Sequence, residues 1–412
     1  MNGKSRYLRK LFAVSLVTLG VVPSLSFGQQ GDTLRIGMTV SSAGAFALAS
    51  QSGTRGVEIW VDEVNARGGV NVGGRKRKVE LVQLDDRSDK QMVTRVYEKL
   101  IVDDKVDVLF GPFGSTLTGA AATVTDRLGK FMAIWSAASD QIYQQGFKYI
   151  VSATQMPVSA VPSMSIELAA KLGFKTIAIP YSDEPFTSGM AEAARKLAEG
   201  HGMKVVMFDR YPKGQKDFST ILQKAKALGA EVFYPAAYEP DLMSMMGQLK
   251  QLNLSFPFTY MHYGSTPQFL ALGNDVNYVY AQTLFHPDIK WKVNAGYDRD
   301  AFLAAYARKF PNASFQADFQ TAQAYGAGVI LEKAIERAGS TDAAALKKAA
   351  LELSGKLTVL PGEYEIEETG KQRKMVTPTM QVMPGRGLVA VWPPVVATAK
   401  PVSPAPSWQE RK

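Results

Sequence analysis

The stretch VDVLFGPFGSTLTG, residues 106–119, decides the fold. Residues 106–110 form an apolar run of strand length, and Gly111 opens a turn that carries glycines and hydroxyl groups. A helix of small residues is predicted to follow at 120–128. A buried strand that passes through a short turn into a helix is the repeating unit of a parallel sheet covered by helices. The stretch therefore predicts an α/β protein.

The same turn also predicts a binding site for a small anionic group. It presents backbone N–H groups, the hydroxyls of Ser115 and Thr116, and the positive end of a helix dipole to one point. Many glycine-bearing turns in α/β proteins bind nothing, so the turn alone leaves both interpretations open.

A second loop of small and hydroxyl residues favours the binding interpretation. WSAASD, residues 135–140, follows the next predicted strand along the chain. Both loops leave the carboxyl edge of the same parallel sheet, which is where open α/β sheets place their ligands. We expect the side chains of Ser115 and Ser139, with backbone groups of Ala137 and Ala138, to contact the ligand.

Strand and helix signals alternate along the rest of the chain and restart once. Apolar strand-like runs in the first series lie at 33–40, 79–84, 106–110 and 131–134, and those in the second series lie at 176–180, 204–208, 231–235 and 256–260. The pattern predicts two doubly wound lobes with parallel central sheets, which together resemble a hinged clamshell.

Three crossings of the chain are predicted to join the lobes, near Ala153, Phe285 and Gly362. Lobe 1 is expected to contain residues 32–154 and 286–361, and lobe 2 residues 155–285 and 362–391. The tail, residues 392–412, is rich in Pro, Ala and Ser, and this composition predicts disorder.

The first 28 residues are predicted to be a secretory signal peptide that is removed. Lys4, Arg6, Arg9 and Lys10 precede an apolar run at 11–22 that is short for a membrane span, and small residues follow. An uncleaved anchor is the alternative. Without these four basic residues the formal charge falls from +9 to +5. The only tight basic run, GGRKRK, reads as a solvated hairpin turn rather than a polyanion patch, so no nucleic-acid partner is expected.

The sequence contains few of the side chains and motifs that enzymes use for catalysis. The chain has no cysteine and only three histidines, His201, His262 and His286, without metal-ligand spacing. There is no GxSxG, Walker A or GxGxxG motif. The pair Asp85-Asp86 is a possible carboxylate pair, but its place at a strand end favours capping of a turn. We therefore expect no catalytic residue, no cofactor and no metal, and a binding protein rather than an enzyme.

Three aromatic residues follow strands of the second lobe: Phe186, Tyr238 and Tyr263. Each is compatible with ordinary packing. If the lobes face one another, however, these rings line the wall of a cleft.

Several of these segments resemble a known family. The start IGMTVSSAGAF, the turn GPFGST, the loop SAAS and the segment AAYEPD resemble type I periplasmic solute-binding proteins of the Leu/Ile/Val-binding class, which serve ABC transporters. The resemblance covers about residues 33–392. It implies that Ser115 and the loop at Ala137 to Ser139 hold a ligand carboxylate, and that Phe186 and Tyr238 contact the ligand from the second lobe.

The chain departs from the family at one place. Amino-acid binders of this class carry an acid for the ligand ammonium in the segment that corresponds to MHYGS, around Tyr263, and this segment has no acid. The acids nearest to the predicted site residues are Glu239 and Asp241, which lie just beyond Tyr238. A buried ammonium without a counter-charge costs several kcal/mol. An aromatic or aliphatic acid is therefore favoured over an amino acid, although tyrosine hydroxyls and backbone carbonyls can also accept from an ammonium.

The resemblance implies a periplasmic protein, monomeric, that captures a small carboxylate-bearing solute and delivers it to an inner-membrane ABC permease. A ligand sensor that reports to a receptor or regulator is one alternative, and a secreted hydrolase is another.

Overall fold

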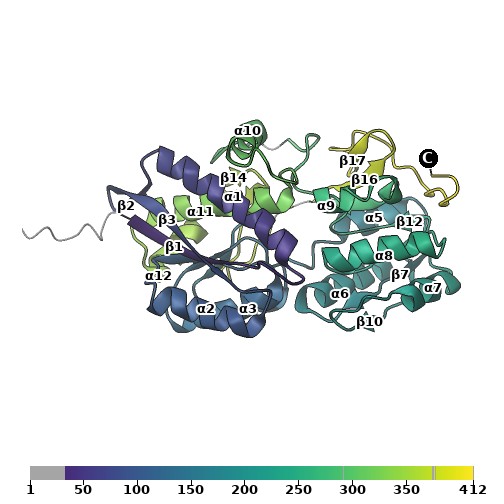
Figure 1. The fold of residues 1–412 in the computed structure, drawn as a ribbon, viewed down its shortest axis with the longest axis horizontal. Helices are drawn as coiled ribbons and strands as arrows, with labels where there is room; N and C mark the ends of the chain where they lie inside the picture. The colour runs from purple at the N-terminus through teal and green to yellow at the C-terminus, as the bar shows by residue number, and fades with distance from the viewer. Residues whose placement is uncertain (1–32, 291, 374, 376, 412) are drawn as a thin grey trace, which may run out of the picture. The chain divides into compact units, whose positions relative to one another are not determined.

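The computed structural model describes residues 33–290, 292–373, 375 and 377–411 (Figure 1). The predicted signal peptide lies outside these residues. In the described part of the chain, no helix combines the length and apolar character that crossing a bilayer requires.

The first lobe is built on a six-stranded sheet with the strand order β2-β3-β1-β4-β5-β6. Its strands are β1 (Thr33–Val40), β2 (Val70–Val72), β3 (Arg75–Asp85), β4 (Val108–Phe110), β5 (Met132–Ile134) and β6 (Ile150–Ser152). Its helices are α1 (Ala47–Ala66), α2 (Lys90–Val102), α3 (Ser115–Arg127), α4 (Asp140–Tyr143), α10 (Arg299–Lys309), α11 (Phe319–Ala338) and α12 (Ala343–Glu352). All neighbouring strands run parallel except β2 and β3, which form a hairpin.

Helices cover both faces of this sheet, with α1 and α11 on one face and α2 and α3 on the other (Figure 1). The buried strand residues explain the arrangement, because Leu34, Ile36 and Met38 are all fully buried. In the basic run GGRKRK, Gly73 and Gly74 form the β2–β3 turn, both at positive φ, and the four basic residues begin β3, so the predicted hairpin is present.

The second lobe is built on a four-stranded parallel sheet with the order β12-β11-β7-β9. Its strands are β7 (Thr176–Ala178), β9 (Lys204–Met207), β11 (Val232–Phe233) and β12 (Phe258–Thr259), and a separate parallel pair is β8 (Tyr181–Ser182) with β10 (Arg210–Tyr211). Its helices are α5 (Ser163–Lys171), α6 (Pro185–Gly200), α7 (Ser219–Ala227), α8 (Glu239–Gln251), α9 (Pro267–Leu270) and η1 (Gly273–Val276).

Late strands complete both lobes. An antiparallel sheet consists of β13 (Tyr280–Gln282), β16 (Thr379–Met383) and β17 (Gly387–Trp392), and an antiparallel hairpin consists of β14 (Leu357–Val359) and β15 (Gly362–Tyr364). A bridge between Tyr260 and Tyr280 links β13 to the end of β12. The predicted α/β class with two parallel sheets is confirmed.

One predicted helix starts earlier than expected. Helix α3 begins at Ser115 rather than at Ala120, because Gly114 adopts a φ of +84° and its carbonyl accepts the first helical bond, from Thr118 N, at 3.0 Å. Ser115 and Thr116 therefore belong to the first turn of the helix, where backbone N–H groups have no partner within the helix.

The third crossing of the chain comes later than the predicted position near Gly362. After that residue the chain still packs on the first lobe: Ser152 N donates to Gly370 O at 2.7 Å, and Tyr364 Oη donates to Ala350 O at 3.1 Å. The β14–β15 hairpin keeps this segment beside α12, and the chain reaches the second lobe only ahead of β16.

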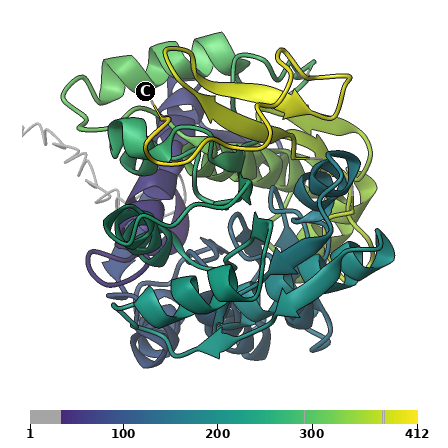
Figure 2. The same ribbon diagram turned by 90° about the vertical axis from the view of Figure 1, so that its right-hand side faces the viewer.

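Residues 393–411 pack against the second lobe, which differs from the disorder that their composition predicts. Val402 N donates to Gln381 Oε1 at 2.8 Å, and Trp408 Nε1 donates to Leu254 O at 2.6 Å. Figure 2 shows this yellow segment folding back beside β16 and β17. Backbone pairing and one indole anchor give order to a segment that has few apolar residues.

Helices α1 and α11 lie unusually close together and fix the position of the site residues on α11. A Cβ atom added at Gly56 would lie 2.0 Å from the carbonyl oxygen of Thr321. At the amino end of α11, Ser52 Oγ donates to Asp318 Oδ1 at 2.6 Å, and Asp318 caps the helix. The glycine is required here because only a bare Cα permits this approach.

Candidate ligand-binding site

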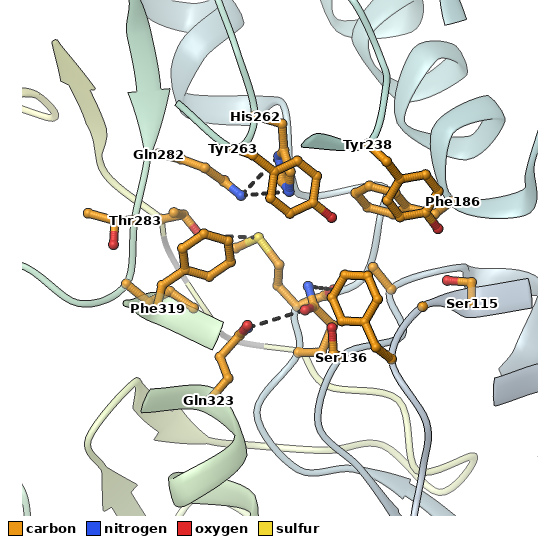
Figure 3. Close-up of a pocket in the computed structure, with 17 residues that line it drawn as sticks. Ser115, Ser136, Phe186, Tyr238, His262, Tyr263, Gln282, Thr283, Phe319 and Gln323 are labelled. Atoms are coloured by element: carbon orange, nitrogen blue, oxygen red, sulfur yellow. Dashed lines mark hydrogen bonds between the residues drawn. The ribbon is translucent and has the colours of Figure 1, made fainter. Parts of the chain in front are cut away.

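A cavity lies among the strand ends, the crossings and the amino end of α11 (Figure 3). It is lined by Phe113, Gly114, Ser115, Ser136, Ala138, Gln155, Met156, Phe186, Tyr238, His262, Tyr263, Gln282, Thr283, Leu284, Phe319, Gln323 and Thr377. Both lobes and all three crossings thus contribute to one cavity.

Ser115 is held ready to donate a hydrogen bond. Its side chain is on the first turn of α3, and Ser139 N donates to its Oγ at 3.0 Å. That bond occupies a lone pair and leaves the hydroxyl proton available to a group in the cavity. The residue is only 3% exposed, so an acceptor bound here is shielded from water.

Tyr238 brings a second hydroxyl to the same end of the cavity. It precedes α8, and its ring contacts Phe46 of the first lobe at a centroid distance of 4.9 Å. A Cβ atom on Gly114 would lie 3.5 Å from its Oη, so the hydroxyl reaches the amino end of α3. Burial raises the pKa of Tyr238, which keeps the phenol protonated and able to donate. Its Oη has no hydrogen-bond partner among the described residues.

Aromatic rings form the wall above these hydroxyls. Phe186 lies 5.6 Å from Tyr238 and 5.3 Å from His262 between ring centroids, and Tyr263 lies 6.1 Å from Phe319. In Figure 3 the labelled rings face the cavity from both lobes. They offer flat apolar surface to a ligand body.

The structure brings five of the eight predicted residues into the cavity lining: Ser115, Ala138, Phe186, Tyr238 and Tyr263. The other three do not line it: Thr116, Ala137 and Ser139. Ser139 instead orients Ser115 through its backbone N–H. Thr116 follows Ser115 on a helix, where adjacent residues point to different sides.

Sequence reasoning missed the lining residues at the crossings. Gln155 and Met156 follow the first crossing, Gln282 to Leu284 precede the second, and Thr377 follows the third. The predicted crossings could have identified these residues, because chain segments that pass between two lobes must line the space between them. Phe319 and Gln323, by contrast, come from the first turns of α11 and carry no local signal.

The cavity has no charged wall. No Asp, Glu, Lys or Arg is among its lining residues. His262 is buried, and burial lowers its pKa to about 3, so the imidazole is neutral at physiological pH. Among the described residues, no three His, Asp or Glu side chains are grouped so as to hold a metal ion.

The carboxylate pair Asp85-Asp86 has a structural role. Asp86 is fully buried and accepts from Thr39 Oγ1 at 2.5 Å, Ser41 Oγ at 2.6 Å and Ser88 N at 2.9 Å. These bonds organise the turns at the ends of β1 and β3, as the capping interpretation predicted.

A buried acid lies close to the cavity without lining it. Glu239 accepts from Thr266 Oγ1 and is only 4% exposed. Burial raises its pKa to about 7, and the nearby Asp318 carboxylate contributes to the rise. At neutral pH this group therefore titrates instead of offering a fixed counter-charge.

We expect Glu239→Gln to stabilise the protein at neutral pH. A folded-state pKa of about 7, above the ordinary glutamate value of 4.5, means that the folded state binds the proton more tightly than the unfolded state. This group's contribution to stability is therefore lost as pH rises from about 4.5 to 7, by an amount on the order of 3 kcal/mol. Urea unfolding between pH 4.5 and 8 measures it. The variant should be more stable than the unmodified protein mainly at the upper end of this pH range. An equal difference in the free energy of unfolding at every pH contradicts the assignment.

Comparisons with known proteins agree with this architecture. The family model described as "Periplasmic binding protein" matches residues 33–385. A Leu-, Ile-, Val-, Thr- and Ala-binding protein of Pseudomonas aeruginosa is 26% identical to this chain. The alignment covers 83% of this chain and 87% of that protein.

Two solved structures share the fold. Streptococcus pneumoniae LivJ, in complex with isoleucine, has a TM-score of 0.75 at 21% identity, over 88% of this chain and 100% of its own. An R. palustris solute-binding protein in complex with benzoate has a TM-score of 0.74 at 18% identity, over 90% of this chain and 98% of its own. The predicted resemblance is confirmed: this chain belongs to the periplasmic binding protein family, as a type I member of the Leu/Ile/Val-binding class.

Proposed function

We propose that this protein captures a small solute with one carboxylate and a neutral, apolar or aromatic body in the periplasm, and delivers it to an inner-membrane ABC permease. The observation that carries the proposal is a cavity that joins hydroxyl donors and a helix amino end to a wall without any charged side chain. The basic and apolar start of the sequence supports export.

The carboxylate is assigned to the end of the cavity at Ser115. The hydroxyls of Ser115 and Tyr238 can each donate to a carboxylate oxygen, and free N–H groups of the first turn of α3 add their dipole. Neutral donors of this kind stabilise an anion in a buried site without a counter-ion, as hydrogen bonds to charged groups are about twice as strong as neutral ones.

The ligand body is assigned to the aromatic wall. An α-amino acid would place its ammonium in a cavity whose lining has no carboxylate, and that costs several kcal/mol. The Pseudomonas aeruginosa relative is named for amino acids and the R. palustris structure holds benzoate, so both ligand classes occur on this fold. The uncharged wall favours the acid without an ammonium.

Capture requires movement of the lobes, since every lining residue except Gln155 is buried. We assign entry to an open state and retention to the closed one, in which Phe46 contacts Tyr238 and the Lys213 ammonium lies 5.1 Å from the Phe46 ring centroid. The permease is the proposed receiver of the closed form. No catalytic residue, cofactor or metal is assigned.

A thermal-shift panel tests the proposed ligand class. It compares aromatic and aliphatic acids with their primary amides and with amino acids, because a ligand that binds only the folded state raises the melting temperature. We expect acids to raise it and their amides to leave it unchanged. If amides raise the melting temperature as much as acids do, the carboxylate assignment is wrong. Delivery to the permease is tested separately: deletion of the gene should abolish cellular uptake of the acid that gives the largest rise in melting temperature.

A further inference from the structure

Two side-chain amides face the cavity at the end opposite Ser115. Gln282 is at the end of β13 and Gln323 is in the second turn of α11, and Figure 3 shows both on the far side of the cavity from Ser115. They are 8% and 2% exposed, respectively. Neither was part of the predicted site.

The orientation of the Gln323 amide is fixed by its neighbours. Its Nε2 donates to Thr154 O and to Gln155 Oε1, each at 3.2 Å. Gln155 Nε2 is itself engaged with Met156 O at 3.1 Å, so its oxygen is the atom that faces Gln323. Since both partners of Nε2 are acceptors, the nitrogen of Gln323 must lie there. Its Oε1 is left without a partner among the described residues.

Gln282 repeats this pattern from the second lobe. Its Nε2 lies 3.0 Å and 3.2 Å from the two ring nitrogens of His262. The neutral imidazole has one ring nitrogen that accepts, so the amide nitrogen has a partner there. Gln282 Oε1, like Gln323 Oε1, has no partner among the described residues.

From these two carbonyl oxygens we infer that the distal end of the cavity, opposite Ser115, binds a neutral hydrogen-bond donor of the ligand. This donor is a group such as a hydroxyl or an N–H, remote from the ligand carboxylate. A buried acceptor without a partner is costly, and a ligand donor removes that cost. The donor is neutral because no carboxylate lines this end to balance a cation. The inference rests on the proposed function, which places the carboxylate at Ser115.

Calorimetric titration of the folded full chain with benzoate and the three monohydroxybenzoates tests the inference. The 3- or 4-hydroxy isomer is expected to bind about tenfold or more tightly than benzoate, because its hydroxyl satisfies a buried acceptor. The 2-hydroxy isomer carries the same atoms next to the carboxylate and should gain nothing.

The variant Gln323→Met should reduce this preference for the distal hydroxyl to less than about threefold while benzoate still binds. Gln282→Met provides a second, independent variant if Gln323→Met does not fold. Gln320→Met is the matched control, because Gln320 is equally buried on α11 and does not line the cavity. It should leave the preference unchanged.

The outcomes separate this inference from the proposed function. If benzoate and all hydroxybenzoates bind equally well, the distal subsite is wrong and the carboxylate site stands. If the preference for a distal hydroxyl survives in both Gln323→Met and Gln282→Met, these glutamines do not bind the hydroxyl. If no member of the series binds, the subsite for a distal hydroxyl is overturned, and the thermal-shift panel, which includes aliphatic acids, decides whether the proposed ligand class stands.

Discussion

Replacing Ser115 by alanine is expected to weaken binding of the carboxylate ligand by about 1.5–3 kcal/mol, or roughly 10- to 150-fold. The serine hydroxyl donates to a charged acceptor in a buried site, and its loss leaves a carboxylate oxygen without that partner. Calorimetric titration with the acid that gives the largest thermal shift measures the change. The corresponding amide should show no comparable dependence on Ser115.

Ser139→Ala is the matched control for this result. This substitution also removes a serine hydroxyl, from the neighbouring loop, but it keeps the Ser139 backbone N–H that orients Ser115. Because the Ser139 side chain does not line the cavity, affinity should stay within about twofold of that of the unmodified protein. Equal losses in Ser115→Ala and Ser139→Ala, or no loss in either, would contradict the direct role of the Ser115 hydroxyl.

The largest expected effect on stability comes from Gly56→Ala. The added methyl group would lie 2.0 Å from Thr321 O and 2.9 Å from Tyr325 N, and both are backbone atoms of α11 that cannot rotate away. Overpacking of this kind costs about 1–3 kcal/mol where side chains can adjust, so about 3 kcal/mol or more is expected. Urea unfolding followed by circular dichroism measures the change.

Gly119→Ala is the control for the same substitution within a helix. No atom lies within 4 Å of a Cβ atom built at Gly119, which is in the interior of α3. Alanine has the higher helix propensity, so this variant should be neutral or up to about 1 kcal/mol more stable. The close packing of α1 on α11 is refuted if Gly56→Ala unfolds at the same urea concentration as Gly119→Ala.

The sequence predicted the architecture well because alternating apolar strands and amphipathic helices leave few arrangements for a chain of this length. Strand β4 and its turn pointed to the edge of the first sheet that borders the cavity. The start of α3 was misplaced, since the φ of Gly114 decides it and the residue pattern does not report that angle. The tail was misjudged on composition, because contacts such as that of Trp408 with Leu254 depend on a distant partner.

The cavity was predicted only where a motif marked it. Ser115, at the start of α3, and Ala138, in the loop after β5, lie at one edge of the first sheet, which local patterns reveal. Gln282 and Gln323 meet only through the tertiary fold, one from β13 and one from α11, and no spacing along the chain relates them. The absence of an acid from the segment MHYGS around Tyr263 was visible in the sequence, and the uncharged lining of the cavity agrees with it, although Glu239 lies close behind that lining.

One titration tests the central claim most directly: 3-phenylpropionate against phenylalanine, measured by calorimetry under identical conditions. The two molecules differ only in the α-ammonium group, so their affinities compare a carboxylate with and without the charge that the cavity does not match. We predict that 3-phenylpropionate binds at least about tenfold more tightly, because no carboxylate lines the cavity to balance an ammonium. Tighter binding of phenylalanine would contradict the claim that this cavity is built for acids without an ammonium group.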